Sequence, residues 1–407
     1  MLFILSGNLC QLHASTKFQR HFNKVVFTLF TREVKMSKTF IAISTLIGTI
    51  IGAGILGIPY VVMKSGFFLG LINILLIAVV MIITMLYLGE VTLRTNSNHH
   101  LAGYAEKYLG KKGKLLMFIS LIVGVYGAIL AYLIGEGESL SYLFFENINH
   151  TLYFGLGFWV LMSIICYFGL KALEEGEELG VILIAVLIVL ISVIFWNKIE
   201  VNNLNYVNWK NMFVPFGVVL FAFLGFNVIP EVKRIFGDDK RGMKRAIIIA
   251  NLIVLVVYIL FAYIVLGSQG ENTPELATLV LGKIFIILGM ITMLTSYLGL
   301  SISLIDTLKF DFGISKVRSW IYTIIPPIFL FTFLEIFNLT SFTKVIGVGG
   351  VMSGGLTGIL ILFMIKEAKK KGDRVPEYSI PYSSILAGII IAIFVIGALL
   401  EILNTLK

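Results

Sequence analysis

Glycine and proline interrupt one long apolar segment of the chain, at a place where exposed peptide groups could bind a charged ligand. The stretch Gly48–Tyr60 holds four glycines and a proline, and it lies within an apolar run at residues 39–63 that could span a bilayer. Glycine and proline disfavour a continuous helix. In hydrocarbon, irregular backbone persists only where protein buries it or where it lines a cavity. Gly52, Ala53 and Gly54 are therefore predicted to break a membrane helix beside a binding site.

A second stretch repeats this pattern later in the chain. Gly54 and Pro59 are five residues apart, and so are Gly225 and Pro230, with an isoleucine before each proline. Interrupted spans at corresponding places in two halves of a chain point to the binding site of a secondary transporter. Because glycine and proline are common in membrane helices generally, the matched pair is more informative than either segment alone.

The ends of a broken helix offer two opposite partial charges. Near Ala53 and Gly54, free N–H groups at a positive dipole end suit a carboxylate. Carbonyl groups near Ile50, and others in the second break, suit an ammonium group or a cation. An α-amino acid zwitterion carries both charges, so these helix ends could bind it without a charged side chain, and the central parts of both segments contain none.

Side chains around the breaks are expected to select the ligand. Aromatic residues of the sixth span and Tyr126 of the third are predicted to form apolar walls, although ordinary aromatic packing is the alternative. Thr295 and Ser296 could complete an all-oxygen Na⁺ site with first-span carbonyls, or they could bond neighbouring helices. The predicted substrate-binding residues are Thr49, Gly52, Ala53, Gly54, Tyr126, Phe221, Ala222, Phe223 and Gly225, and the predicted Na⁺ ligands are Ile50, Thr295 and Ser296.

The composition is that of a polytopic membrane protein. Of the 407 residues, 58% are hydrophobic and 14% charged, and the mean hydropathy is +0.96; soluble domains are about half apolar and a quarter charged. The two cysteines give no disulfide framework. The net charge of +9 follows membrane orientation, so we expect a lipid bilayer and no nucleic acid as the partner of this surface.

Apolar run length predicts eleven spans and no separate soluble domain. Residues 39–404 are expected to form one eleven-helix transporter domain. Residues 1–38 are predicted to be an N-terminal tail, with Met36 as the expected true start. The predicted spans are residues 39–63, 67–93, 114–144, 153–170, 178–196, 211–231, 245–267, 282–308, 318–337, 342–365 and 383–404.

Lysine and arginine indicate the orientation of these spans. With the N-terminus inside, 26 of the 32 Lys and Arg residues fall on the inner side, as the positive-inside rule requires. This places the C-terminus outside and makes the first and sixth spans antiparallel. Five spans followed by five of opposite topology form an inverted repeat, and the eleventh span is an addition.

Ionisable residues are rare within the spans. Glu136 and Glu138 lie toward the outer end of the third span, where Glu136 could line an outer vestibule, and Glu90 and Glu231 lie toward the inner face. Intramembrane carboxyls are functional candidates, whereas interfacial ones are usually solvated. The sequence contains neither an H-E-x-x-H helix nor a phosphate-binding P-loop, so an enzyme or an ATP-driven pump is not expected.

Several motifs resemble those of the amino acid/auxin permease family, within the amino acid–polyamine–organocation superfamily. The resemblance rests on residues 48–59, on Thr295-Ser-Tyr-Leu-Gly299 and on the later Asp306. It implies an all-α LeuT-like fold with alternating access, like the tyrosine and tryptophan permeases and sodium-coupled neutral amino acid transporters. It also implies that Gly52, Ala53 and Gly54 hold the substrate carboxylate.

The same resemblance implies that Phe221 and Ala222 receive the amine, and that Thr295 or Ser296 lies where sodium-coupled relatives have a cation ligand. One departure is Asn227, near the place where many relatives have a histidine. This departure leaves the coupling ion open.

Together these features predict a multi-pass cell-membrane protein that symports neutral amino acids, aromatic or other large ones among them, with H⁺ or Na⁺ and has no other cofactor. A non-transporting amino acid sensor on the same fold and an ion channel are the alternatives.

Overall fold

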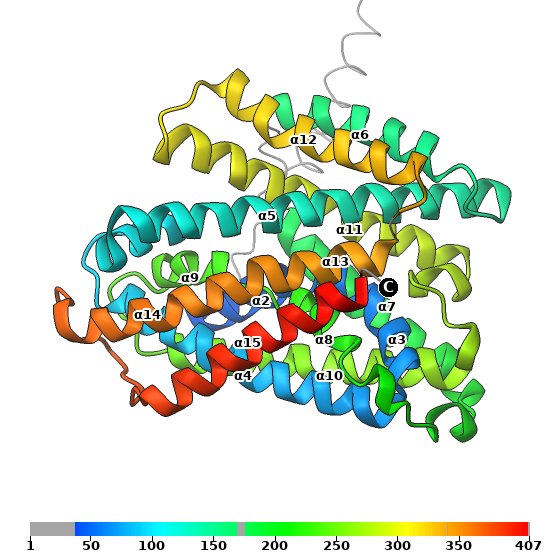
Figure 1. Cartoon of the computed structure of the whole chain (residues 1–407), viewed down its shortest axis with the longest axis horizontal. Coiled ribbons are helices and arrows are strands. Elements are labelled where there is room, and N and C mark those ends of the chain that lie inside the picture. Colours follow the sequence, from blue (N-terminus) through cyan, green and yellow to red (C-terminus); the bar gives the residue numbers. More distant parts are fainter. Residues whose placement is uncertain (1–36, 169–175, 340, 406–407) are drawn as a thin grey trace, which may run out of the picture.

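The computed structural model describes residues 37–168, 176–339 and 341–405, which fold into a bundle of long helices (Figure 1). Among these residues, nine helical segments are long and apolar enough to cross a membrane, with α8–α9 and α13–α14 each counted as one segment. The bent pair α2–α3 makes a tenth span. Helix α7 takes the place of the fifth predicted span. The helices are α2 (Lys38–Ile50), α3 (Gly54–Ser65), α4 (Phe67–Leu93), α5 (Leu101–Phe145), α6 (Thr151–Phe168), α7 (Gly176–Phe195), α8 (Pro215–Ala222), α9 (Ile229–Phe236), α10 (Met243–Gln269), α11 (Lys283–Asp306), α12 (Lys316–Ile336), α13 (Phe342–Gly349), α14 (Leu356–Lys371) and α15 (Ser384–Thr405).

The first and sixth spans are both interrupted, as predicted. Helices α2 and α3 meet at an angle of 57° across residues 51–53. In the sixth span, helix α8 ends at Ala222 and helix α9 begins at Ile229, with a single 3-10 turn (Phe226–Val228) between them. The proline of each repeat lies in the half-helix that follows its break, Pro59 in α3 and Pro230 in the first turn of α9.

The two broken spans lie side by side and run in opposite directions. Helix α3 packs on α8, and α2 packs on α9, so each half-helix of the first span contacts the half of the sixth that lies at its own level. Helix α10 covers both α2 and α3, while the long helix α5 contacts α6, α11, α12, α13 and α14 on the other side. This is the predicted inverted repeat of five and five spans, with α15 as the eleventh.

Two spans differ in detail from the prediction. The third is longer than residues 114–144, because α5 begins at Leu101 and continues to Phe145, with a local break at Gly110 (φ 73°). The tenth contains a π-helical turn at Gly350–Gly355 between α13 and α14. Single π-turns widen a helix locally and are frequent at functional sites. The predictions for the tail and for Met36 fall outside the described residues.

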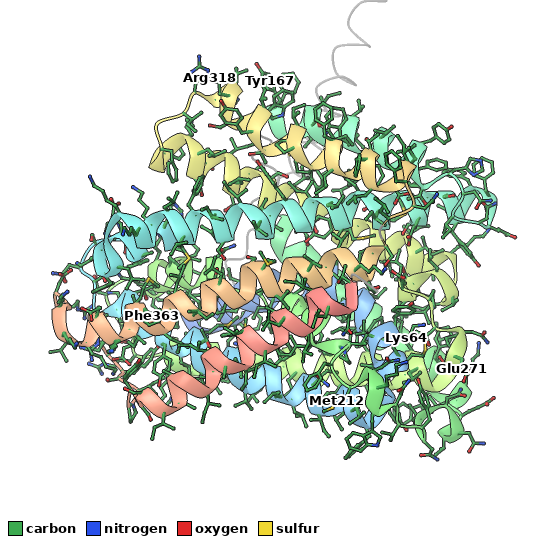
Figure 2. All side chains as sticks on the ribbon, viewed as in Figure 1. Lys64, Tyr167, Met212, Glu271, Arg318 and Phe363 are labelled. Carbon is green, nitrogen blue, oxygen red and sulfur yellow. The ribbon has the colours of Figure 1, made fainter. Side chains whose placement is uncertain are left out.

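Apolar side chains point outward around the bundle, as expected for contact with lipid. Val193, Phe329 and Tyr153 are each more than two-thirds exposed, a pattern that a surface in contact with water rarely shows over large areas. Figure 2 shows Lys64 and Glu271 together at one end of the molecule, and Phe363 on α14 nearer the opposite end. Outward apolar faces and polar ends agree with a multi-pass membrane protein.

A buried carboxylate joins several elements at the end of the bundle that holds Arg94, Lys233 and Lys369, the Lys- and Arg-rich end. Glu90 of α4 is fully buried, and its Oε1 accepts hydrogen bonds from Lys369 (2.7 Å), Arg94 (2.9 Å) and Ser379 (2.9 Å). Its Oε2 accepts from the Ile380 N–H at 2.8 Å. The expectation of a simply solvated interfacial glutamate is therefore wrong here. The carboxylate fixes the ends of α4 and α14 and the segment that leads into α15.

Candidate functional site

The break in the first span leaves peptide groups without backbone partners. The Gly52 N–H turns back to the Ile50 carbonyl at 3.0 Å, and the Ile55 N–H bonds the Gly52 carbonyl. Within the described chain, no backbone acceptor receives the Ala53 or Gly54 N–H, as the start of a half-helix requires. These donors mark the positive dipole end of α3.

Tyr258 of α10 connects the two breaks. Its buried hydroxyl lies 3.1 Å from the Ile50 carbonyl oxygen and 2.6 Å from the Ala222 carbonyl oxygen. These carbonyls end α2 and α8, the half-helices whose C-terminal oxygens need partners outside the helix. The Tyr258 hydroxyl, on the seventh span, therefore lies within hydrogen-bond distance of the carboxyl ends of both α2 and α8.

The breaks also touch directly. A Cβ atom added to Gly54 would lie 2.7 Å from the Cα of Ala222, which is closer than two carbon atoms can pack. Only glycine allows the first turn of α3 to approach the end of α8 at this distance. The requirement explains why glycine stands at this position of the motif.

A cavity of about 320 Å³ lies against both breaks. It continues past Asn227 to Glu231, both of which are exposed, so it opens toward the Lys- and Arg-rich end. Its lining residues are Thr45, Gly48, Thr49, Ile50, Ile51, Gly52, Gly54, Leu121, Gly124, Val125, Ala128, Tyr132, Phe221, Ala222, Leu224, Gly225, Phe226, Asn227, Val228, Glu231, Thr292, Thr295, Ser296, Gly299, Leu300, Ser303, Ser353 and Thr357. The only charged side chain among these is that of Glu231, which pairs with Arg234 at 2.9 Å.

The structure brings most of the sequence-predicted site residues to this cavity. The predicted residues that line it are Thr49, Ile50, Gly52, Gly54, Phe221, Ala222, Gly225, Thr295 and Ser296. Ala53, Tyr126 and Phe223 do not line it. Ala53 is buried within the break, and Phe223 is fully buried with its ring 5.0 Å from that of Tyr258.

Tyr126 is placed elsewhere than predicted. Its hydroxyl donates to the Tyr322 carbonyl of α12, on the side of α5 away from the cavity. Tyr132, six residues later, takes the expected place instead: it lines the cavity, and its hydroxyl lies beside Ser296. A Cβ on Gly52 would lie 3.6 Å from both the Tyr132 and Ser296 oxygens. At 3.6 residues per turn, six residues rotate a side chain by about two-thirds of a turn, so only one of these tyrosines can face the site.

Oxygen atoms suited to a small cation gather near the first-span break. The Ile50 carbonyl already accepts from Gly52 and Tyr258, so it is less available than predicted. The neighbouring carbonyls of Gly48 and Ile51 accept no hydrogen bond from the described residues. Gly48 and Ile51 line the cavity together with Thr295 and Ser296, so their oxygens are candidates for the all-oxygen donor set that hard cations prefer.

Comparisons with known proteins agree with this geometry. Residues 35–280 match the model of the tryptophan/tyrosine permease family. Glutamine transporter 2 of Aliivibrio fischeri is 24% identical over 353 residues, which is 82% of this chain and 90% of the relative. The tyrosine-specific transport system 1 of Haemophilus influenzae is 24% identical, over 84% and 91% of the two chains. The tryptophan-specific transport protein of Shigella flexneri is 22% identical, over 88% and 93%.

A solved structure shares the fold. The crystal structure of MhsT in complex with L-phenylalanine superposes with a TM-score of 0.55 and 17% identity, covering 90% of this chain and 97% of that one. This likeness supports the LeuT-like arrangement of the helices. Since the family model covers more than half of the sequence, the chain belongs to the tryptophan/tyrosine permease family.

Proposed function

We propose that this amino acid permease is a secondary active symporter of large neutral amino acids that works by alternating access. The observation that carries the proposal is the pairing of two broken, antiparallel helices beside one cavity. Such breaks place peptide dipoles at the centre of a membrane protein, where they can bind a charged ligand.

The substrate's α-carboxylate would bind the N-terminal end of α3. No backbone acceptor in the described part of the chain receives the Ala53 or Gly54 N–H, and the helix dipole favours an anion there. The α-ammonium would face the carbonyl end of α8, where Phe221 and Ala222 line the cavity. Neither contact needs a charged side chain, so both apply to any α-amino acid.

The lining favours an uncharged substrate side chain. Phe221, Phe226 and Tyr132 contribute aromatic surface, and the only charged lining residue is Glu231 at the far end of the cavity. A volume of about 320 Å³ is in the range of small-molecule sites. Relatives named for tyrosine, tryptophan and glutamine transport make these amino acids, with phenylalanine, the first to test.

The coupling ion is Na⁺ or a proton. A Na⁺ ion would bind the carbonyls of Gly48 and Ile51 and the hydroxyls of Thr295 and Ser296, where it would supply positive charge beside the substrate carboxylate. These oxygens border the first-span break, so binding of the ion and of the substrate would favour the same conformation.

With the N-terminus cytoplasmic and the C-terminus outside, the cavity faces the cytoplasm. This orientation places the Lys- and Arg-rich end inside, according to the positive-inside rule. The structure then represents the inward-open state of the transport cycle, and the outer halves of the spans form the closed side.

Thiol labelling tests this assignment. In a variant whose two native cysteines are replaced by serine, Asn227→Cys should react with a membrane-impermeant reagent in inside-out vesicles, and bound tyrosine or tryptophan should slow the reaction. Asn251→Cys is the control, because Asn251 is fully buried on α10. Labelling of Asn227→Cys from the outer side alone, or at a rate that no amino acid changes, would contradict the proposal.

A further inference from the structure

Glu136 on α5 is a carboxyl group buried in the membrane-spanning region without a charged partner. Its side chain is 1% exposed, and Oε1 has no hydrogen-bond partner among the described residues. The ion pairs found in the described chain, which involve Glu90, Glu231 and other acidic residues, do not include it. A buried polar atom of this kind requires an explanation.

The carboxyl borders an apolar groove of about 390 Å³, separate from the substrate cavity. The groove lies between α5, α6 and α11, and apart from Glu136 its lining holds no charged residue. The other lining residues are Leu140, Tyr153, Phe154, Gly157, Phe158, Leu161, Ile287, Met290, Ile291 and Leu294. Glu136 therefore faces a groove between helices rather than an outer vestibule continuous with the substrate cavity.

Among the described residues, no positively charged group contacts Glu136. Tyr153 of α6 lines the same groove as Glu136. Tyr297 of α11 packs against Phe158, another residue of the groove, with the two rings 5.5 Å apart. Helix α13 contributes Phe342 beside the adjacent Gly135. On α5 itself the nearest titratable groups are Tyr132 and Glu138, and Glu138 interacts with Glu275 and Glu335.

This setting favours the protonated carboxylic acid. An ionised carboxylate without water or a cation is strongly disfavoured in an apolar environment, so such a group binds a proton instead. Intramembrane carboxyls of this kind form proton relays in pumps and transporters. If the side chain at this position only filled space in the interior, an apolar residue of similar size would stabilise the fold more than a carboxyl group does.

Glu136 also lies close to both possible routes for a proton. Tyr132 is one turn earlier on the same face of α5, and its hydroxyl lies beside Ser296 in the substrate cavity. The Tyr132 and Tyr297 rings are 6.4 Å apart, and Tyr297 also packs against Phe158, which lines the groove. On the other side, the groove reaches Tyr153 in the first turn of α6, close to the end of that span.

We propose that Glu136 is the proton-binding group of a proton-coupled transport cycle. Its carboxylate gains a proton from water on one side of the membrane, carries it as the neutral acid while α5, α6 and α11 are packed as here, and loses it to water on the other side. The inference rests on the proposed transport function and selects the proton as the coupling ion.

The test compares exchange with accumulation in proteoliposomes, for the wild-type protein and for Glu136→Gln. Exchange of labelled for unlabelled tyrosine, at equal pH on both sides, needs no net proton movement. Accumulation driven by an acidic exterior does need net proton movement. A difference of one pH unit supports at most about tenfold accumulation when one proton moves with each substrate molecule. Glu136→Gln is expected to retain exchange and to lose pH-driven accumulation, so that the inside concentration only reaches that outside.

The matched control is Glu401→Gln. Glu401 of α15 is another buried carboxyl, 7% exposed, but it packs against Gly217 of α8 and Gly347 of α13. This variant should keep both exchange and accumulation. If Glu136→Gln accumulates tyrosine as the wild type does, or if the wild type accumulates it only with a Na⁺ gradient, the inference is overturned while transport itself stands. A wild-type protein that neither exchanges nor accumulates any amino acid would overturn the proposed function as well.

If Glu136→Gln fails to fold, a second variant and a spectroscopic measurement still test whether Glu136 binds the proton. Glu136→Asp keeps an acid on a shorter side chain, so it should retain pH-driven accumulation with a shifted pH profile; an unchanged profile would count against the proposal. Infrared difference spectra of the wild type between acidic and alkaline pH should contain the band of a protonated carboxyl, and its position should move in Glu136→Asp. A band that does not move would assign the proton to another group.

Discussion

Gly54 and Ala222 are in contact through their backbones, at the point where the two interrupted spans meet. A side-chain carbon on Gly54 would lie 2.7 Å from the Ala222 Cα and 3.1 Å from its nitrogen. Because the obstacle is backbone, a change of rotamer cannot relieve it.

Replacing Gly54 by alanine should therefore separate the breaks. We expect at least about a fivefold loss of amino acid uptake, since overpacking at a rigid contact costs about 1–3 kcal/mol, and Gly54→Leu should abolish uptake while membrane insertion persists. The control is Gly388→Ala on α15, where an added Cβ meets nothing within 4 Å. Normal uptake by Gly54→Leu would mean that this contact is not part of the site.

Tyr258 should matter through its hydroxyl group. Tyr258→Phe keeps the buried ring but leaves the carbonyls of Ile50 and Ala222 without this donor. We expect the free energy of unfolding to fall by about 1 kcal/mol and uptake to slow, as measured by thermal unfolding in detergent and by initial rates. Tyr263→Phe on the same helix is the control, because Tyr263 makes ring contacts with Phe67 and Trp196. Equal effects of the two substitutions would rule out a specific role for the Tyr258 hydroxyl.

Tyr132 and Tyr126 form a matched pair on one helix. Tyr132→Phe removes the hydroxyl that lies beside Ser296 in the cavity, and it should raise KM for the substrate by up to about tenfold, the equivalent of one hydrogen bond. Tyr126→Phe removes only a bond to the Tyr322 carbonyl outside the cavity, and should leave KM unchanged. If Tyr126→Phe has the larger effect on KM, the cavity described here is not where the substrate binds.

Glu90 should be important for stability. Glu90→Ala would leave Arg94 and Lys369, whose side chains are 17% and 22% exposed, without their shared carboxylate. Breaking a buried charge pair typically costs about 3 kcal/mol, so the unfolding temperature in detergent should fall clearly. Glu367→Ala is the comparison, because Glu367 pairs only with the exposed Lys370 and Lys371. A fall of similar size in both variants would show that the burial of Glu90 is not what matters.

The sequence predicted the architecture well, because its signals are local. Glycine and proline in an apolar run locate each break, and the run lengths with the Lys and Arg distribution imply the inverted repeat. Family membership also makes the chain a permease rather than an enzyme. Thr295 and Ser296 reach the cavity because adjacent hydroxyls halfway along a span lie at the level of the breaks.

What the sequence could not supply depends on contacts between distant residues. The choice of Tyr132 over Tyr126 requires the rotation of α5 about its axis, and an apolar helix with aromatic residues on several faces leaves that rotation undetermined. Glu90 meets Lys369 and Ser379, more than 270 residues away. The bridge from Tyr258 to both breaks likewise exists only in the folded chain.

Uptake into proteoliposomes tests the central claim most directly. The purified protein should accumulate labelled tyrosine, tryptophan, phenylalanine or glutamine above the outside concentration when a pH or Na⁺ gradient is imposed alone. The accumulation should disappear when an ionophore collapses that gradient, and Gly54→Leu should show none. Saturable uptake that follows neither gradient, or no uptake of any of these amino acids, would contradict the account of a symporter built on two broken helices.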